Sequence, residues 1–304
     1  MKTWSLSLLT LLSGCLISLP AFGGVPATTS DPSAPTRNFA AQGVIQQLPA
    51  DHQTVVIKHG AIASYMEAMT MPFKVKDSAL LNGLAAGDEV TFQLHVTDDE
   101  SWVDHIRKIG TAPVTVATSP AVAPIDPLPP GSFMNYPLTN ELGKTVTLQD
   151  FHGQALAITF FYTRCPLPDF CPRLSKNFSE ATAKLRALPG APANWHFLSI
   201  SFDTAFDTPD MLKSYGELYG YHPNEWSFLT GSPAEIKELA RLSGVNYTVD
   251  GGGFNHNFRT LIVDPAGHLQ MTFPMGGDLS ADIVTQILRA AAATNEPAIS
   301  ASTH

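Results

Sequence analysis

The sequence predicts a small all-β domain followed by a mixed α/β domain. Short strand-like runs separated by turns fill residues 38–110, whereas strands alternate with helices over residues 131–293. A segment rich in Pro and Ala separates the two patterns. With 304 residues, 44% of them apolar, the chain is long enough to bury two hydrophobic cores.

Residues 1–27 have the pattern of a secretory signal, with Lys2, an apolar run and then small residues. Two processing routes are open. Leu12–Cys15 resembles a bacterial lipobox, which would lipidate Cys15 and anchor the protein to a membrane. The residues after Cys15 stay apolar, however, which favours an ordinary cleavage site near Ala21–Gly23. Either route predicts a location outside the cytoplasm, in a bacterial periplasm.

The first folded domain is expected at residues 38–110, after a polar, Pro-containing linker at residues 28–37. The spacing of its strand-like runs is typical of a small antiparallel barrel. These runs are Phe39–Leu48, Gln53–Lys58, Glu89–Val96 and Trp102–Ile109.

A methionine-rich segment lies within this domain. Met69 and Met71 alternate on a predicted strand, so their thioethers lie on one face, and His59 and Met66 precede them. Thioethers prefer soft ions such as copper(I), which suggests a metal site. Methionine is also a common core residue, and the spacing alone favours that role.

The pattern H-x-x-I…M-x-A-M-T-M-P-F resembles the periplasmic copper-binding module of Cus-type efflux systems, a five-stranded, OB-like barrel. The resemblance spans residues 38–110. It implies that His59, Met69 and Met71 bind copper(I) or silver(I). The metal-facing Trp of that family has no counterpart here. Met66 stands near its place and is a further candidate ligand.

Residues 111–130 are rich in Ala, Pro, Val and Thr without helical periodicity, and predict a semi-rigid linker. The second domain is expected at residues 131–293. The polar tail, residues 294–304, is expected to be disordered.

Two cysteines lie where a buried strand meets a helix. Ala155–Tyr162 is apolar and partly β-branched or aromatic, which indicates a core strand, and apolar residues recur at helical spacing over Arg173–Leu188. Cys165 and Cys171 therefore lie on the turn, beside a helix N-terminus that lowers a thiol pKa. The pair suits a structural disulfide, a redox dithiol or a site for copper(I) or zinc.

The remaining elements complete the α/β pattern. Asp207-Thr208-Pro209 predicts a capped helix start, so Asp203 and Asp207 are interpreted as turn and cap residues rather than catalytic acids. The other predicted strands and helices are Trp195–Ser201, Trp226–Thr230, Pro233–Ser243, Thr260–Asp264, Leu269–Phe273 and Asp278–Ala292. Gly251–Gly253 predicts a flexible loop that leads into His256.

Three ordered segments, FYTRCPLPDFCP, SFDTAFDTP and NHNFRTLIVDP, resemble signatures of the Sco/SenC copper proteins over residues 131–292. The resemblance implies a thioredoxin-like fold and copper ligands at Cys165, Cys171 and His256. Five residues, Pro166–Phe170, separate the cysteines, where the family usually has a shorter loop.

The resemblance implies a non-enzymatic copper chaperone. Its acceptor would be the copper-centre subunit of cytochrome c oxidase or another periplasmic copper protein, and a thiol reductant would keep the cysteines able to bind. A thiol–disulfide oxidoreductase using Cys165 and Cys171 is the alternative, although Arg259 occupies the slot of the cis-proline usual in such enzymes. Copper buffering or resistance is a third hypothesis. The net charge of −9 argues against nucleic acid as a partner.

Overall fold

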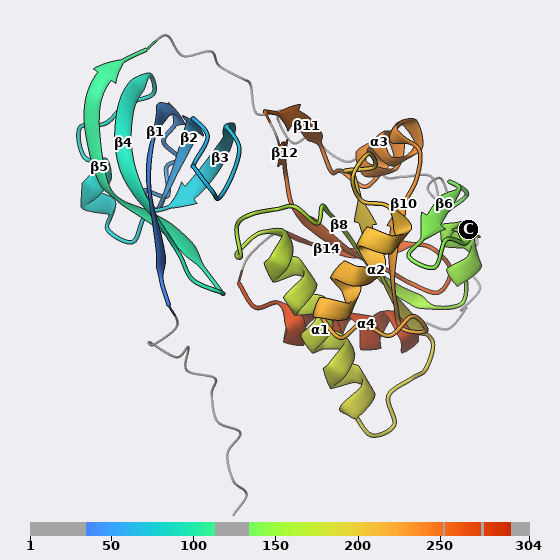
Figure 1. Cartoon of the computed structure of the whole chain (residues 1–304). Coiled ribbons are helices and arrows are strands. Elements are labelled where there is room, and N and C mark those ends of the chain that lie inside the picture. The colour runs from blue at the N-terminus through green and yellow to red at the C-terminus, as the bar shows by residue number, and fades with distance from the viewer. Residues whose placement is uncertain (1–34, 113–133, 252, 275–276, 293–304) are drawn as a thin grey trace, which may run out of the picture. The chain divides into compact units, whose positions relative to one another are not determined.

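The computed structural model describes residues 35–112, 134–251, 253–274 and 277–292 (Figure 1). The predicted leader and the lipobox, most of both linkers and all of the predicted tail lie outside these ranges. Within these ranges, no helix is both long and apolar enough to cross a membrane.

The first domain is a five-stranded antiparallel sheet with the order β3-β2-β1-β4-β5 (Figure 1). Its strands are β1 (Arg37–Gln47), β2 (Thr54–His59), β3 (Met69–Lys74), β4 (Asp88–Val96) and β5 (Ser101–Thr111). The all-β, OB-like prediction is confirmed, but a closed barrel is not detected. Among the described residues, a single bridge between Val75 and Val103 links the two edges of the sheet.

Alternation of side chains sets the two faces of this sheet. Along β4, buried and partly exposed residues alternate without a break, so Phe92, Leu94 and Val96 face the core. His95 lies on the opposite, outer face. The core face also carries Ile45, Val55, Ile57 and Phe73, all buried.

The second domain is built on a seven-stranded mixed sheet with the order β14-β13-β8-β9-β10-β6-β7. Its strands are β6 (Leu138–Asn140), β7 (Thr145–Val146), β8 (Ala155–Phe161), β9 (Trp195–Ser201), β10 (Trp226–Thr230), β13 (Arg259–Val263) and β14 (Leu269–Pro274). The central strands β8, β9 and β10 are parallel, and every residue in them is buried. Helices therefore cover both faces, which explains the continuous apolar runs in the sequence.

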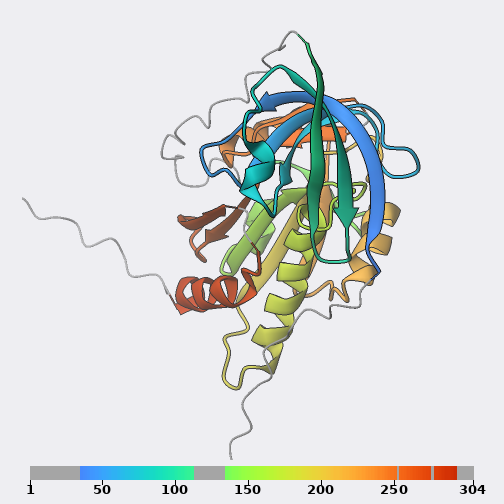
Figure 2. The same cartoon turned by 90° about the vertical axis from the view of Figure 1, so that its left-hand side faces the viewer.

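Four α-helices pack around this sheet: α1 (Cys171–Ala187), α2 (Pro209–Leu218), α3 (Pro233–Leu242) and α4 (Ser280–Ala292). Right-handed crossovers from β8 to β9 and from β9 to β10 place α1 and α2 on the same face. Helix α4 lies beside α1 (Figure 1, Figure 2). Phe178 anchors α1, with its ring 4.8 Å from that of Phe197 and 5.8 Å from that of Trp226.

Three local predictions differ from the structure. Helix α1 begins at Cys171 rather than Arg173, because Pro172 fits the first turn of a helix. The hydroxyl of Thr208, not the Asp207 carboxylate, caps α2. The flexible loop expected before His256 is largely a hairpin of β11 (Tyr247–Asp250) and β12 (Gly253–His256).

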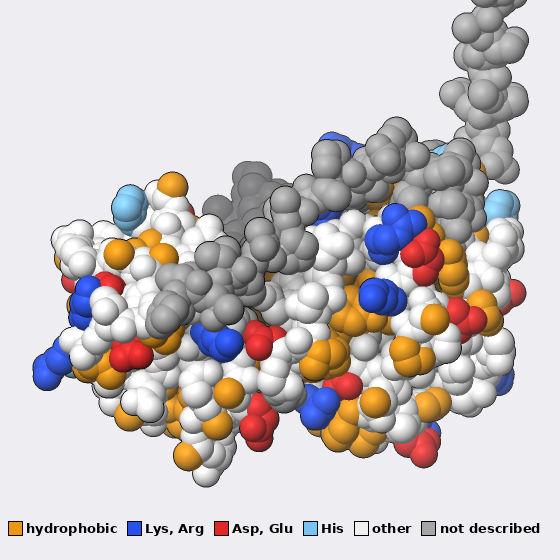
Figure 3. Space-filling view, turned by 90° about the horizontal axis from the view of Figure 1, so that it is seen from above, with side chains coloured by type: hydrophobic (Ala, Val, Ile, Leu, Met, Phe, Trp, Pro, Cys, Tyr) orange, Lys and Arg blue, Asp and Glu red, His pale blue; other side chains and the backbone are white. Residues whose placement is uncertain are grey.

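Charged side chains of both signs are interspersed on the face shown in Figure 3. The described residues of that face therefore show no extended basic surface of the kind that binds a phosphate backbone.

Candidate metal centres

The two cysteines lie at the carboxyl end of β8, where the chain turns into α1. Cys171 is the first residue of α1 and is fully buried, whereas Cys165 in the turn is half-buried. Both are free thiols. The parallel sheet thus presents the pair at the strand ends, which is where α/β folds usually place their sites.

The surroundings of the two thiols shift their pKa values in opposite directions. Burial raises the pKa of Cys165, but donors from Cys171, from the Leu167 amide and from Tyr162 outweigh burial and lower it overall. Burial and the neighbouring Cys165 raise the pKa of Cys171. The position at the helix start was expected to lower both values, and for Cys171 burial outweighs that effect. Cys165 is therefore the more acidic thiol of the pair.

Two aspartates hold the turn between β8 and Cys165. The Asp207 carboxylate is fully buried and accepts hydrogen bonds from the Thr163 amide at 3.0 Å, the Thr163 hydroxyl and the Ser201 hydroxyl at 2.5 Å. The Asp203 carboxylate accepts two hydrogen bonds from Arg164, at 2.9 and 2.6 Å. Both aspartates thus position the cysteine turn, which agrees with their interpretation as structural residues, although Asp207 is not the helix cap that was expected.

His256 reaches the cysteines from the hairpin β11–β12, in which it pairs with Tyr247. Its Nδ1 lies 3.0 Å from the Asn257 carbonyl oxygen, so Nδ1 carries the proton and the Nε2 lone pair is free. That Nε2 atom is 4.0 Å from Cys171 Sγ. Burial lowers the pKa of His256 to about 4, so the imidazole is neutral at neutral pH and can act as a ligand.

The distance between Cys171 and His256 suits a shared metal ion. An ion about 2.3 Å from a thiolate and about 2.0 Å from an imidazole spans at most about 4.3 Å between them. The observed 4.0 Å lies within this limit. In the described part of the chain, the ligand atoms of Cys165, Cys171 and His256 do not all lie within 4.8 Å of one another. Cys165 must therefore move closer to Cys171 and His256 for all three residues to bind one ion.

The second group of predicted ligands lies on the core face of the first sheet. In the ladder between β2 and β3, His59 is directly opposite Met69, and Met71 is two residues farther along the same face. Met69 and Met71 are buried, as is Met66, which a bridge to Ile62 holds just before β3. The register thus brings one imidazole and two thioethers together, and leaves Met66 outside the strand pair.

The His59 ring has an unsatisfied nitrogen. Its Nδ1 lies 2.7 Å from the Gly60 carbonyl oxygen, which fixes the proton there. Nε2 is buried and has no hydrogen-bond partner among the described residues. Burial lowers the pKa of His59, although the Gly60 carbonyl opposes this, so the ring is favoured in its neutral form. A buried lone pair without a donor fits a soft metal ion beside the thioethers.

Each of the two domains matches a known family. Residues 131–292, just over half of the 304 residues, match the family described as SCO1/SenC. The chain belongs to the SCO1/SenC family. Residues 38–108 match the copper-binding periplasmic protein CusF, so a CusF-like copper-binding domain precedes the Sco domain.

Relatives of the Sco domain include proteins with known structures. The SCO1 protein homolog of Bacillus subtilis (strain 168) is 31% identical over 105 residues, which cover 34% of this chain and 52% of that protein. A structure of Bradyrhizobium japonicum ScoI with copper bound is 28% identical, with a TM-score of 0.43, and covers 51% of this chain and 96% of that chain. A structure of BsSco, described as having a disulfide switch and as a member of the Sco family of cytochrome c oxidase assembly proteins, is 26% identical, with a TM-score of 0.47, and covers 56% of this chain and 98% of that chain. This chain spans at most about half the length of the curated relatives that it matches.

Tyr162 is a site residue that the sequence did not identify. Its hydroxyl group contributes to the lowered pKa of Cys165, and its ring centre is 6.1 Å from that of His256. The rings of Phe202 and Phe258 also pack on His256, with their centres 4.7 and 4.1 Å from the centre of the imidazole. A tyrosine at the end of a core strand, shortly before a cysteine, is the signal that could have indicated this role.

Proposed function

We propose that this protein is a periplasmic copper protein that receives copper(I) and delivers it to an acceptor. Its ligands would be Cys165, Cys171 and His256 in the Sco domain, and His59, Met69 and Met71 in the CusF-like domain. The observation that carries the proposal is common to both histidines. Each places Nδ1 against a neighbouring backbone carbonyl oxygen, which frees Nε2 for a metal ion beside sulfur atoms.

Copper would move by ligand exchange. Copper(I) would enter at the His–Met site, whose thioethers bind it without carrying charge, and pass to the thiolate site. From there it would reach an acceptor, which we propose is the copper-centre subunit of cytochrome c oxidase. Support comes from family membership, since a similar protein, BsSco, is described as a member of a family of cytochrome c oxidase assembly proteins.

The cysteines must be reduced for this role. A Cys165–Cys171 disulfide has no thiolate for copper, so a thiol reductant must supply two electrons and two protons. The lowered pKa of Cys165 favours the thiolate form that would bind the metal, and Tyr162 contributes to that lowering.

The difference in pKa between Cys165 and Cys171 also favours a second candidate function, thiol–disulfide exchange. The Cys165 thiolate would attack a disulfide of the acceptor and form a mixed disulfide, releasing one acceptor thiolate. Cys171, once deprotonated, would displace the second acceptor sulfur. The products would be a Cys165–Cys171 disulfide and a reduced acceptor, so a dithiol must regenerate the protein in each cycle.

Copper transfer and thiol turnover can be separated with His256→Ala, since the imidazole binds metal but takes no part in the exchange reaction. The chaperone proposal predicts that this variant loses copper(I) transfer to a copper-free acceptor domain, while His268→Ala, a change of a histidine that contacts Asp264 instead, does not. Multiple turnover of a disulfide substrate that is unaffected by His256→Ala would contradict the chaperone role and support the reductase.

The CusF-like domain also favours copper buffering as a role. A deletion strain with normal cytochrome oxidase activity but raised copper sensitivity would indicate that the protein buffers copper rather than delivers it to the oxidase.

The periplasmic location is supported by the match to a periplasmic copper-binding protein. Fractionation with Cys15→Ser would test the lipid anchor, because loss of lipid would move the protein from the membrane to the soluble fraction.

A further inference from the structure

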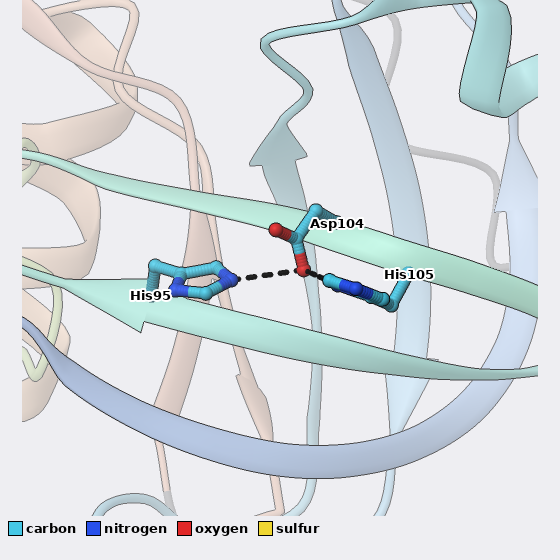
Figure 4. Close-up of side chains that lie close together, drawn as sticks. All are labelled: His95, Asp104 and His105. Carbon is cyan, nitrogen blue, oxygen red and sulfur yellow. Dashed lines mark hydrogen bonds and ion pairs between the residues drawn. The ribbon is translucent and has the colours of Figure 1, made fainter.

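A second cluster of potential metal ligands lies on the outer face of the CusF-like sheet. Within the described ranges, His95, Asp104 and His105 form the one group of His, Cys, Asp and Glu residues whose ligand atoms all lie within 4.8 Å of one another. His95 Nε2 is 2.8 Å from Asp104 Oδ1, and His105 Nδ1 is 2.5 Å from the same oxygen (Figure 4). None of these atoms belongs to the site at His59.

A β-bulge creates this convergence. Asp104 and His105 are consecutive, so in a regular strand their side chains would point to opposite faces. The pairing of β4 with β5 shifts register between Thr91 and Gln93, and His105 has a left-handed backbone with φ of 50°. The extra residue turns the His105 ring toward Asp104. A left-handed conformation is costly for a residue other than glycine, and such strain often marks functional sites.

The partner of the other His95 nitrogen determines which atom is free. Asn38 lies directly opposite His95 on β1, and its Oδ1 is 2.7 Å from His95 Nδ1. An amide oxygen accepts hydrogen bonds only, so His95 Nδ1 carries the proton. In the neutral ring the Nε2 lone pair then faces the Asp104 carboxylate. Nε2 is also inaccessible to solvent and has no hydrogen-bond partner in the described part of the chain.

Two electron-rich atoms at this distance require a positive species between or beside them. Either His95 takes a second proton, or a metal ion binds both atoms. Two ligands each about 2.0 Å from one tetrahedral ion are about 3.3 Å apart. Nε2 and Oδ1 are 2.8 Å apart, so they would separate by about half an ångström to hold such an ion. Donation of the remaining imidazole N–H to an oxygen acceptor such as Asn38 is the usual arrangement around a metal-binding histidine.

We propose that His95, Asp104 and His105 form a binding site for a divalent transition-metal ion, of the kind that Zn²⁺ and Cu²⁺ represent. Two imidazoles and one carboxylate are nitrogen and oxygen donors, which suit these ions rather than copper(I). Three protein ligands leave a coordination position open to water. The exposed side of the site is formed by His105, whose side chain is 77% exposed, so an ion can enter from solvent.

The neighbouring side chains stabilise the site without occupying it. The Trp102 ring stacks on His95, with centres 5.1 Å apart and an angle of 9° between planes. Lys76 lies over Trp102 and forms an ion pair with Glu100, so its charge is directed away from the ligands.

The CusF-like domain would therefore hold two metal sites of different chemistry on opposite faces of one sheet. His59, Met69 and Met71 lie on the core face, and His95 and Asp104 lie on the outer face. The soft site would take copper(I), and the outer site would take a divalent ion.

Zinc titration of the whole chain by calorimetry tests the site. Cys165 and Cys171 are first replaced by serine, so that the two thiolates of the Sco domain contribute no zinc affinity. His105→Ala is then compared with His52→Ala, a matched control because His52 is also exposed and left-handed, with φ of 51°. We expect His105→Ala to lose the zinc ion that His52→Ala retains. Equal zinc binding by the two variants, with equal thermal unfolding, would overturn the proposal.

Two further measurements distinguish a metal site from a protonated ion pair. Asn38→Ala should weaken zinc binding about 10- to 100-fold, because the proton on His95 would no longer be fixed on Nδ1. Electron paramagnetic resonance of added Cu²⁺ should show coupling to two nitrogens in the Cys165→Ser/Cys171→Ser background, and to one when His105→Ala is added. A spectrum that is the same in both would mean that Cu²⁺ binds elsewhere, and would contradict the assignment.

Discussion

At the scale of single residues, the two thiols of the Sco domain differ in reactivity. The Cys165 pKa is lowered and the Cys171 pKa is raised. We predict that iodoacetamide modifies Cys165 first near neutral pH. Tyr162→Phe removes a donor to the thiolate, so it should raise the Cys165 pKa and slow the reaction. Mass spectrometry of peptides alkylated at a series of pH values measures this, and faster modification of Cys171 would contradict it.

The neutral form of His256 links stability and copper binding to pH. Its pKa of about 4 lies below the ordinary value of 6.5, so the unfolded chain takes up a proton before the folded chain does. The contribution of His256 to the free energy of unfolding is therefore fully present above pH 6.5, and it is lost as the pH drops toward 4. His256→Gln should reduce the slope of unfolding free energy against pH in that window. Part of the slope should remain in His256→Gln, because burial also lowers the pKa of His196 to about 4 and this residue is unchanged.

At the scale of elements, Asp207 holds the turn that carries Cys165. Asp207→Ala would leave the Thr163 amide and the Ser201 hydroxyl without their acceptor, in the interior. We expect a loss of about 2–3 kcal/mol in urea unfolding, with weaker copper(I) binding. Asp203→Ala is the control, since Arg164 is 43% exposed and such a pair contributes about 1 kcal/mol or less. Equal losses for the two variants would contradict the special role of Asp207.

The elements also show what the sequence could predict. Helix α3 was predicted almost as found, because Ser232 and Glu235 form a capping box around Pro233. The hairpin β11–β12 was missed, because consecutive glycines carry no side-chain pattern and pairing with Tyr247 is a long-range choice. The motifs indicated His256 as a ligand, but not the Asn257 carbonyl that fixes its proton. Similarly, strand alternation places His105 away from Asp104, and only the bulge reverses this.

At the scale of the whole molecule, we propose one copper(I) site in each domain. Each proposed donor set contains sulfur atoms and a histidine whose pKa burial lowers, but thiolates would bind in the Sco domain and thioethers in the CusF-like domain. Met69→Leu/Met71→Leu should abolish the second site with little effect on folding, because leucine conserves the volume of methionine. Met211→Leu/Met271→Leu changes two exposed methionines instead, and thermal unfolding of both variants provides the check.

The most direct test of the central claim is the amount of copper(I) bound per reduced chain, measured by competition with a copper(I) chelator. The account predicts about two ions for the unaltered chain and about one each for Cys165→Ser/Cys171→Ser and Met69→Leu/Met71→Leu. The exposed-methionine control should bind about two, like the unaltered chain. Full copper binding by the cysteine variant would contradict the account, because the Sco domain would then hold its metal without the two thiols.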